Sequence, residues 1–327
     1  MRLQKLTFFA LLLSYFQVAR AQNWETLNPS NTCTKRHESS LVADGNKIII
    51  LGGRGIKPIE IFDTKTQVWT QHAPTPIEIH HFQATNYKGE IYVMGAFTGT
   101  EFFPHEKPIE NVYIYNIAKN EWRKGPEIPR DRLRGAAGCA IFKDKIYVVG
   151  GAQDGHWDGS TAWVDEFDPH TNKWRKLADA PHARDHVSIG IVNNKLYVAG
   201  GRRAAGKSGN GLNTTEAAVD VYDFATNSWQ TLPESLNIPT QRAGSSAVVV
   251  GQKLLIIGGE SGAQELAHSE VEALDTKQMK WEKLPNLVKG RHGTGVALIA
   301  GKLYTAAGCG NRGGRPELDS IEAFKVQ

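Results

Sequence analysis

The stretch KIYVVGG at residues 145–151, followed by VDEFDPHTNKW at residues 164–174, decides the fold of this 327-residue chain. It contains a short apolar run that ends in two glycines, a second run that ends in Asp, and a turn before a tryptophan. Runs of β-branched and aromatic residues between Gly and Asp turns are typical of short β-strands. The stretch therefore predicts a small antiparallel unit of strands.

The same unit repeats along the chain. The hydrophobic residue that opens each apolar run is found at Ile48, Ile91, Ile146, Leu196, Leu254 and Leu303. Four positions later a pair of small residues begins, at Gly52-Gly53, Gly95-Ala96, Gly150-Gly151, Gly200-Gly201, Gly258-Gly259 and Ala307-Gly308. The tryptophans that follow are spaced by 53, 52, 55 and 52 residues, at Trp69, Trp122, Trp174, Trp229 and Trp281. Even spacing of this length predicts a repeat architecture rather than unrelated domains.

This pattern resembles the Kelch repeat, and the resemblance covers the chain from residue 22 to residue 327. It implies an all-β, six-bladed Kelch β-propeller in which each blade is a sheet of four antiparallel strands. Each tryptophan should fill the core of a blade. Each glycine pair should let inner strands pack closely near the axis, where a side chain would not fit.

The sixth repeat has no tryptophan of its own, since it ends at Ile321-Glu322-Ala323-Phe324. The segment Trp24-Glu25-Thr26-Leu27 matches the missing part, because it resembles Trp229-Gln230-Thr231-Leu232. We therefore predict that the N-terminal strand forms the outer strand of the last blade and closes the ring.

The first 21 residues predict a signal peptide. Arg2 and Lys5 precede an apolar run from Leu6 to Val18, and Ala19-Arg20-Ala21 matches an A-x-A cleavage site. The run is shorter than the roughly 20 apolar residues that a membrane-spanning helix needs. We therefore expect cleavage after Ala21, a secreted or periplasmic protein without membrane insertion, and a single propeller domain over residues 22–327.

The predicted mature chain carries almost no net charge. Loss of Arg2, Lys5 and Arg20 with the leader lowers the formal net charge from +4 to +1. No run rich in Lys and Arg remains, so nucleic acid is not an expected partner. We expect a monomer without a cofactor.

Loop lengths indicate which face of the ring is specialised. Most of the variation between repeats falls after the glycine pair, in the loop that joins the second and third strands of each blade, here called the b–c loop. Binding residues of repeat proteins tend to lie on such loops. On the same face, twelve residues before each anchor, stand Arg36, Ile79, Arg134, Arg184, Arg242 and Arg291. In some Kelch proteins such arginines contact acidic ligands, and the alternative is that they bind carbonyl and carboxylate groups of neighbouring blades.

Histidines gather beside these positions. His37, His80 and His292 follow the arginine position by one residue, and His81 and His186 follow it by two. Imidazoles can act as acid–base groups, metal ligands or hydrogen-bonding partners. Because alternate residues of a strand face opposite ways, not all of them can converge. No metal site is predicted.

The b–c loops add aromatic and charged groups. Phe102, Phe103 and Trp157 would suit a sugar ring or a protein loop, and Arg202 and Glu260 stand in two further loops. The ligand-binding residues predicted from these patterns are Arg36, His80, His81, Arg134, His156, Trp157, Arg184, His186, Arg242, Arg291 and His292.

These groups favour a binding platform for an anionic carbohydrate or an acidic protein segment, and no catalytic residue is identified. The alternative is an enzyme, because exported Kelch proteins include a sialic-acid mutarotase and a uronic-acid lyase would need similar Arg and His groups. A copper oxidase of the galactose-oxidase type is not supported, since the chain has no Tyr-His dipeptide. A His and an Arg that converge on one pocket would favour the enzyme, and a shallow patch would favour the platform.

The chain has three cysteines. Cys33 and Cys309 are predicted to form a disulfide, because both should lie on the same face of adjacent blades and an exported protein meets an oxidising compartment. Cys139, five residues after Arg134, should be a buried free thiol in an inner strand.

Overall fold

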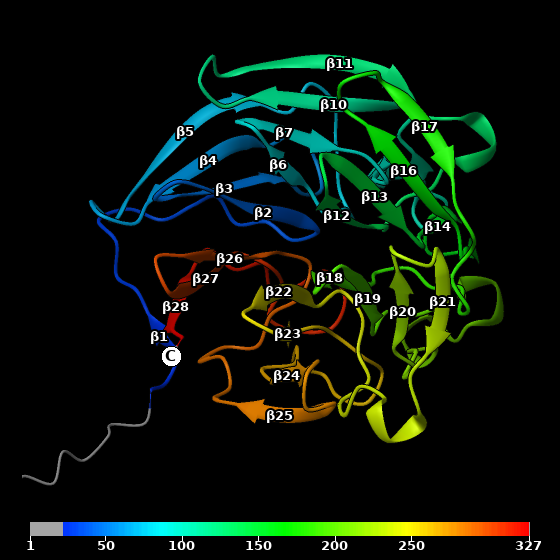
Figure 1. Cartoon of the computed structure of the whole chain (residues 1–327). Coiled ribbons are helices and arrows are strands. Elements are labelled where there is room, and N and C mark those ends of the chain that lie inside the picture. Colours follow the sequence, from blue (N-terminus) through cyan, green and yellow to red (C-terminus); the bar gives the residue numbers. More distant parts are fainter. Residues whose placement is uncertain (1–21, 327) are drawn as a thin grey trace, which may run out of the picture.

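A computed structural model describes residues 22–326 as a ring of six four-stranded antiparallel sheets (Figure 1). The all-β six-bladed propeller predicted from the repeats is confirmed. Within residues 22–326 the only helical segments are short 3₁₀ turns such as η3 (Gly206–Ser208) and η4 (Gly211–Asn213). None of these segments is long and apolar enough to cross a membrane. The predicted signal peptide, residues 1–21, lies outside the described residues.

The strands of each blade follow one another from the axis outward. Blade one contains β2 (Ser39–Asp44), β3 (Lys47–Gly52), β4 (Pro58–Asp63) and β5 (Val68–Pro74). Blade two contains β6 (Thr85–Tyr87), β7 (Glu90–Val93), β10 (Asn111–Asn116) and β11 (Glu121–Glu127). Blade three contains β12 (Gly138–Phe142), β13 (Lys145–Val149), β16 (Val164–Asp168) and β17 (Lys173–Lys176). Blade four contains β18 (Ser188–Val192), β19 (Lys195–Ala199), β20 (Asp220–Asp223) and β21 (Ser228–Thr231). Blade five contains β22 (Ser246–Val250), β23 (Lys253–Ile257), β24 (Val271–Asp275) and β25 (Lys280–Leu284). Blade six contains β26 (Val296–Ile299), β27 (Lys302–Ala306), β28 (Ile321–Lys325) and β1 (Glu25–Thr26).

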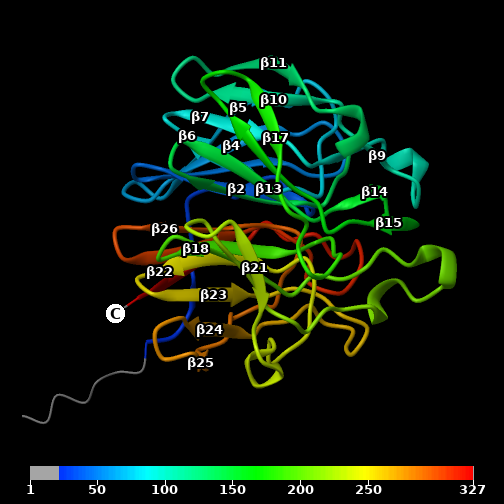
Figure 2. The ribbon, with the colours of Figure 1, turned by 45° about the vertical axis from the view of Figure 1, so that its right-hand side comes forward.

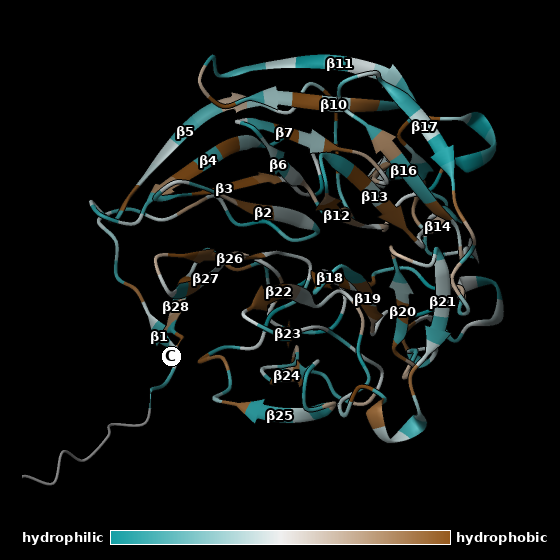
Figure 3. Cartoon of the chain, viewed as in Figure 1, coloured by the Kyte–Doolittle hydropathy of each residue, from teal (hydrophilic) through white to brown (hydrophobic). Residues whose placement is uncertain are grey.

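The second strand of each blade is the most deeply buried. In β3, Ile48, Ile49, Ile50 and Leu51 are all fully buried, because neighbouring blades pack against both faces of the sheet. A strand buried on both faces has no polar alternation, which explains why these segments are continuous apolar runs in the sequence. The outermost strands, such as β5, β17 and β25, carry more hydrophilic residues (Figure 3).

The glycine pairs bring adjacent blades into backbone contact near the axis. Gly150 and Gly151 have φ angles of 65° and 104°, which residues with a side chain rarely adopt. A Cβ atom on Gly150 would lie 2.4 Å from the carbonyl oxygen of Arg184, and one on Gly151 would lie 2.7 Å from that of Gly135. The close packing predicted at this pair is confirmed.

The N-terminal strand closes the ring, as the repeat pattern predicts. β1 pairs antiparallel with β28, with Glu25 opposite Ala323, and the two strands lie side by side in Figure 1. Trp24 is 4 % exposed and stacks on Phe324 with ring centroids 5.5 Å apart. The last blade is therefore assembled from both ends of the described chain.

The repeat tryptophans pack against the cores of their blades, as predicted, and three of them also reach the seam with the preceding blade. Trp69 is buried, but Trp122, Trp174, Trp229 and Trp281 are only partly buried. Three of the indole N–H groups donate to backbone carbonyls of the preceding blade, in the pairs Trp174–Glu127, Trp229–Ala178 and Trp281–Leu236. These side chains thus tie one blade to the next.

The predicted disulfide is absent, since Cys33, Cys139 and Cys309 are all free and buried. Cys33 lies in the apolar core shared by blades one and six, where its thiol donates to the carbonyl oxygen of Asp319 over 3.5 Å. Cys309 is held at the axis, because its backbone bridges to His292. No bond joins these two thiols. Cys139 is the buried free thiol that was predicted, and burial raises its pKa to about 12.

Candidate functional site

A collar of six residues surrounds the axis of the ring. They are the second residues after the arginine positions, and all have a left-handed backbone with φ between 51° and 62°: Glu38, His81, Ala136, His186, Gly244 and Gly293. Backbone hydrogen bonds of 2.8–3.1 Å link each to the next, and a bond from Ser39 to Gly293 completes the circle. Residues other than glycine are uncommon in this conformation. The backbone of the collar therefore fixes where Glu38, His81 and His186 stand.

The five repeat arginines lie inside the blades, with exposed fractions of 0–3 %. Each donates to backbone carbonyls and to a carboxylate on the third strand of its blade, in the pairs Arg36–Glu60, Arg134–Asp165, Arg184–Asp220, Arg242–Glu272 and Arg291–Glu322. The prediction that these arginines bind a ligand is therefore corrected. Most of their donors are used by groups within the blade, the exceptions being the Nε atoms of Arg184 and Arg291, and none of the five lines either of the two cavities described below.

Blade two shows what happens when the arginine is missing. Ile79 takes its place and is fully buried. Tyr113 occupies the position of the carboxylate, because it lies two residues before Tyr115, which faces the blade tryptophan as Phe62 does in blade one. Both charges are absent together, since a single buried charge without its partner would be strongly destabilising.

A cavity of about 1300 Å³ opens at the mouth of the axis, on the face that carries the b–c loops. All six of these loops contribute to its lining. The loops of blades two and three contain the small ribbons β8 (Phe97–Thr98) with β9 (Lys107–Pro108) and β14 (Ala152–Asp154) with β15 (Asp158–Ser160), and the second of these projects with β9 on one side in Figure 2. A narrower space of about 40 Å³ continues along the axis past His81 and His186.

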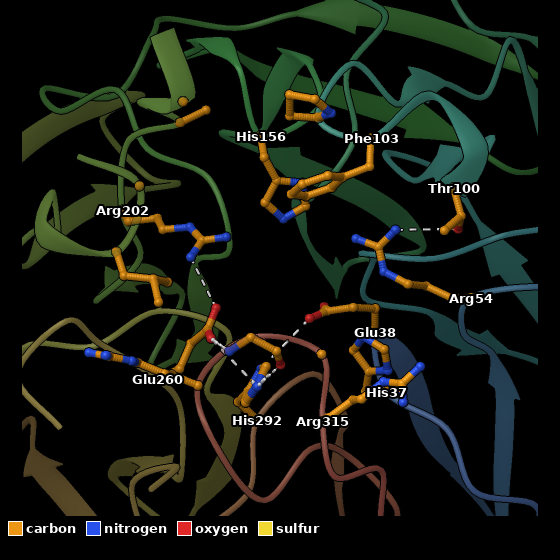
Figure 4. Close-up of a pocket in the computed structure, with 18 of the residues that line it drawn as sticks. His37, Glu38, Arg54, Thr100, Phe103, His156, Arg202, Glu260, His292 and Arg315 are labelled. Carbon is orange, nitrogen blue, oxygen red and sulfur yellow. Dashed lines mark hydrogen bonds and ion pairs between the residues drawn. The ribbon is translucent and has the colours of Figure 1, made fainter. Parts of the chain in front are cut away.

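On one side of the cavity, His292 lies between two carboxylates (Figure 4). Its Nε2 atom is 3.5 Å from Glu260, and its Nδ1 atom is 3.7 Å from Glu38. Glu260 also accepts a bond of 3.0 Å from Arg202. Burial lowers the pKa of His292, but the carboxylates outweigh it and raise the pKa to about 10. Burial raises the pKa of Glu260, but His292 and Arg202 together lower it to about 2.

On the opposite side, Glu106 joins Arg54 to His156. The carboxylate accepts bonds of 2.9 Å from Arg54 and 3.0 Å from His156 Nδ1. Burial raises the pKa of Glu106, but these two partners lower it to about 2. The ring of Phe103 lies 5.3 Å from that of His156 and 5.7 Å from the guanidinium of Arg54. This side of the cavity thus presents one aromatic face beside a charged group.

Comparison with known proteins agrees with the ring and its repeats. The family model described as the Attractin/LZTR1 beta-propeller matches residues 9–265. The chain belongs to this Kelch-like propeller family. Kelch-like protein terF of Aspergillus terreus is 25% identical over 300 residues, which are 86% of this chain and 62% of that protein. Human Kelch-like protein 38 is 25% identical over 221 residues, 65% of this chain and 35% of that protein.

This Kelch-like propeller spans less than two thirds of either relative. Among solved structures, the structure of YjhT superposes with a TM-score of 0.74 and 19% identity, covering 89% of this chain and 95% of that one. At that identity the likeness shows the fold alone.

The structure brings together only part of the site predicted for the propeller. Of the residues predicted to bind a ligand, His156, Trp157 and His292 line the mouth cavity. His81 and His186 line the narrow space below it. His80 is fully buried beside His81, to which its Nδ1 atom is hydrogen-bonded.

Sequence reasoning missed Arg54, Glu38 and Glu106. The repeat pattern could have identified Arg54, because the residue after each glycine pair faces the axis. These residues are Arg54, Phe97, Ala152, Arg202, Glu260 and Cys309. Three of these six are charged, and all three line the cavity. Glu106 has no such signal, since the b–c loops differ in length and its position in that of blade two has no equivalent in the others.

The ion cluster around His292 predicts a pH-dependent stability. The folded-state pKa of about 10 lies above the unfolded value, so the stabilisation is complete below about pH 6.5 and is lost as the pH rises through 10. The titration of one such group changes the free energy of unfolding by at most about 1.4 kcal/mol per pH unit. We expect the free energy of unfolding, measured in urea at pH 7 and pH 9, to fall more in the wild type than in His292→Gln. Equal changes in the two proteins would contradict the charged state of His292.

Proposed function

We propose that this propeller binds a small anionic ligand, in the first instance a carboxylated sugar, in the cavity at the mouth of its axis. One observation carries the proposal: Arg54 and Arg202 reach into a single cavity from different sides (Figure 4). Phe103 and Trp157 line the same cavity. A sugar acid offers a carboxylate for a guanidinium and an apolar ring face for an aromatic side chain.

The charge of the lining supports an anionic ligand. The basic residues of the lining are Lys35, Arg54, Arg202, Arg312 and Arg315, and the acidic ones are Glu38, Asp185, Glu260 and Glu317. With His292 protonated, positive charges exceed negative ones by two. A cavity lined by an excess of one sign concentrates ligands of the other sign.

The shape of the site favours a small ligand over an extended protein segment. The cavity is bounded by all six b–c loops, whereas a platform would present a flat patch. Its volume of about 1300 Å³ is above the roughly 300–1,000 Å³ of most small-molecule sites. It therefore has room for a sugar of more than one unit, and a longer acidic chain could only insert its end.

A second candidate function is catalysis on the same ligand class, as a sugar-acid mutarotase or a uronic-acid lyase. The observation in its favour is the convergence of His156 and Arg54 on this cavity, with Glu106 orienting the imidazole. Burial lowers the pKa of His156, so its imidazole is neutral and able to accept a proton at neutral pH. The carboxylate of the substrate would pair with the guanidinium.

Binding is tested by calorimetric titration with N-acetylneuraminic acid and galacturonic acid, with uncharged galactose as the reference sugar. We expect the acids alone to bind, and added salt to weaken them. Arg54→Ala should lose about 10–100-fold in affinity, which corresponds to one charge-assisted hydrogen bond. The matched control is Arg203→Ala, because Arg203 is exposed and does not line the cavity.

Two outcomes would contradict the binding proposal. One is equal affinity for galactose and the two acids, and the other is equal losses in Arg54→Ala and Arg203→Ala. Magnetisation exchange between the α and β anomers, and the ultraviolet absorbance of an unsaturated product, separate the enzyme from the binding protein. Binding without either signal would leave a binding protein.

A further inference from the structure

Three histidines from different parts of the chain meet beneath the mouth cavity. They are His81 and His186 of the collar and His156 of the b–c loop of blade three. Their ring centroids are separated by 4.8, 5.1 and 5.4 Å. One nitrogen of each ring lies within 4.8 Å of one nitrogen of both others. Such a triangle of imidazoles is the arrangement that a three-histidine metal site requires.

Each imidazole is oriented by a hydrogen bond on its other nitrogen. His156 Nδ1 bonds to Glu106 at 3.0 Å, and His186 Nδ1 bonds to Asp185 at 2.5 Å. These carboxylates accept protons from Nδ1, which leaves a lone pair on each Nε2, and that of His186 faces the guanidinium of Arg202 at 3.4 Å. His81 Nδ1 bonds in the same way to the Nδ1 atom of His80. Metal-binding histidines nearly always have a second partner of this kind.

The charges around the three rings favour a cation at their centre. Three carboxylates contact them directly, because Glu38 lies 3.4 Å from His81 Nε2 in addition to the contacts of Glu106 and Asp185. Two guanidinium groups oppose these charges: that of Arg202, 3.4 Å from His186 Nε2, and that of Arg54, which donates to Glu106 over 2.9 Å. Arg202 is itself neutralised by Glu260, at 3.0 Å.

We propose that His81, His156 and His186 bind one divalent transition metal ion, with zinc as the best match to three neutral imidazoles. Zinc–nitrogen bonds of about 2.0–2.1 Å in a tetrahedron place the nitrogens about 3.4 Å apart. The three nitrogens, at most 4.8 Å apart, therefore close by about 1.4 Å at most when the ion binds. Rotation of the side chain of His156, the one partly exposed member, supplies much of this movement.

The proposed metal site is open on the side of the mouth cavity. His156 lines the mouth cavity, whereas His81 and His186 line the narrow axial space. A fourth coordination position would therefore face the cavity, where a ligand with an oxygen donor could reach it. The metal site goes beyond the proposed binding of a sugar acid and does not depend on it. It also replaces the expectation, drawn from the sequence, of a propeller without a metal.

The test is a titration of the untagged protein, first stripped with a chelator, with Zn²⁺ alone in a calorimeter. We expect one equivalent of Zn²⁺ per chain, and a visible absorption band of low-coordinate cobalt when Co²⁺ is used instead. His156→Ala should weaken Zn²⁺ binding by more than about 100-fold and remove the cobalt band. The control is His105→Ala, since His105 is exposed and outside the triangle, and it should bind Zn²⁺ as the wild type does.

A second variant keeps the test decisive if His156→Ala fails to fold, as judged by circular dichroism. Glu106→Gln keeps all three imidazoles but removes the carboxylate that orients His156, and it should weaken Zn²⁺ binding by about 10–100-fold. Absence of stoichiometric binding to the folded wild type would overturn the proposal. Equal affinity of the wild type, His105→Ala and whichever of His156→Ala and Glu106→Gln folds would also overturn it. No sugar is present in these experiments, so failure here leaves the proposed ligand binding intact.

Discussion

Replacing Arg242 by Ala is expected to lower the free energy of unfolding by about 3–5 kcal/mol, although no ligand-binding group is lost. The guanidinium donates to the carbonyl oxygens of Gly258, Thr240 and Ile256 at 2.6–3.1 Å and to Glu272 at 2.6 Å. Arg242 is 0 % exposed and Glu272 is 1 % exposed. Removal of the cation leaves a buried carboxylate without its partner, and the measurement is unfolding in guanidinium chloride.

Two further variants separate the buried ion pair from a general effect of losing an arginine. Arg175→Ala breaks a pair with Glu166 in which the arginine is exposed, and should cost about 0–1 kcal/mol. The double variant Arg242→Met with Glu272→Leu should lose less stability than Arg242→Ala alone, because no charge is left unpaired. Blade two already uses an apolar solution of this kind at Ile79. If Arg242→Ala and Arg175→Ala lower the free energy of unfolding equally, the stabilising role of the buried pair of Arg242 with Glu272 is wrong.

The ring should also depend strongly on the strand that closes it. Trp24→Ala is expected to lower the free energy of unfolding by about 3–5 kcal/mol, because Trp24 is 4 % exposed and stacks on Phe324 in the core of blades five and six. Deletion of residues 22–27 removes the pairing of β1 with β28 as well, and should destabilise the protein further. Thermal melting and chemical unfolding measure both effects.

Trp157→Ala is the matched control for the closure of the ring. Trp157 is also a tryptophan, but it is only partly buried and lies in a b–c loop against His105, with ring centroids 4.9 Å apart. Loss of this side chain should cost no more than about 1 kcal/mol. An unchanged melting temperature after the deletion of residues 22–27 would show that the ring does not need its N-terminal strand.

The cavity residues show where inference from the sequence stops. His81, His156 and His186 are separated by 75 and 30 positions, and they belong to three different blades. His81 and His186 share one repeat position, that of the collar, but no spacing rule connects His156 to them, because it lies in the b–c loop of blade three and these loops differ in length. Glu106 is likewise invisible as a partner of His156 until the loops of blades two and three are seen side by side.

The arginines illustrate a different limit. Their repetition places them at one position in five blades, but repetition does not say which way a side chain points. The answer depends on Glu60, Asp165 and their counterparts on the third strand, which come close only when the blade is folded. The carboxylates can be read from the sequence, but only the tertiary structure shows that they pair with the arginines. The same holds for Cys33 and Cys309, which are both buried and free in the folded chain.

The sequence by itself determined the class of fold, the number of blades and the closure of the ring by Trp24 and its neighbours. These features depend on local, repeated patterns: buried strands must be apolar, and a tight approach of two backbones needs glycine. Only the tertiary structure decided which polar groups face the cavity and which are used inside the blades. That choice depends on distances between segments far apart in the chain, and a shift of a few ångströms separates a buried ion pair from a binding site.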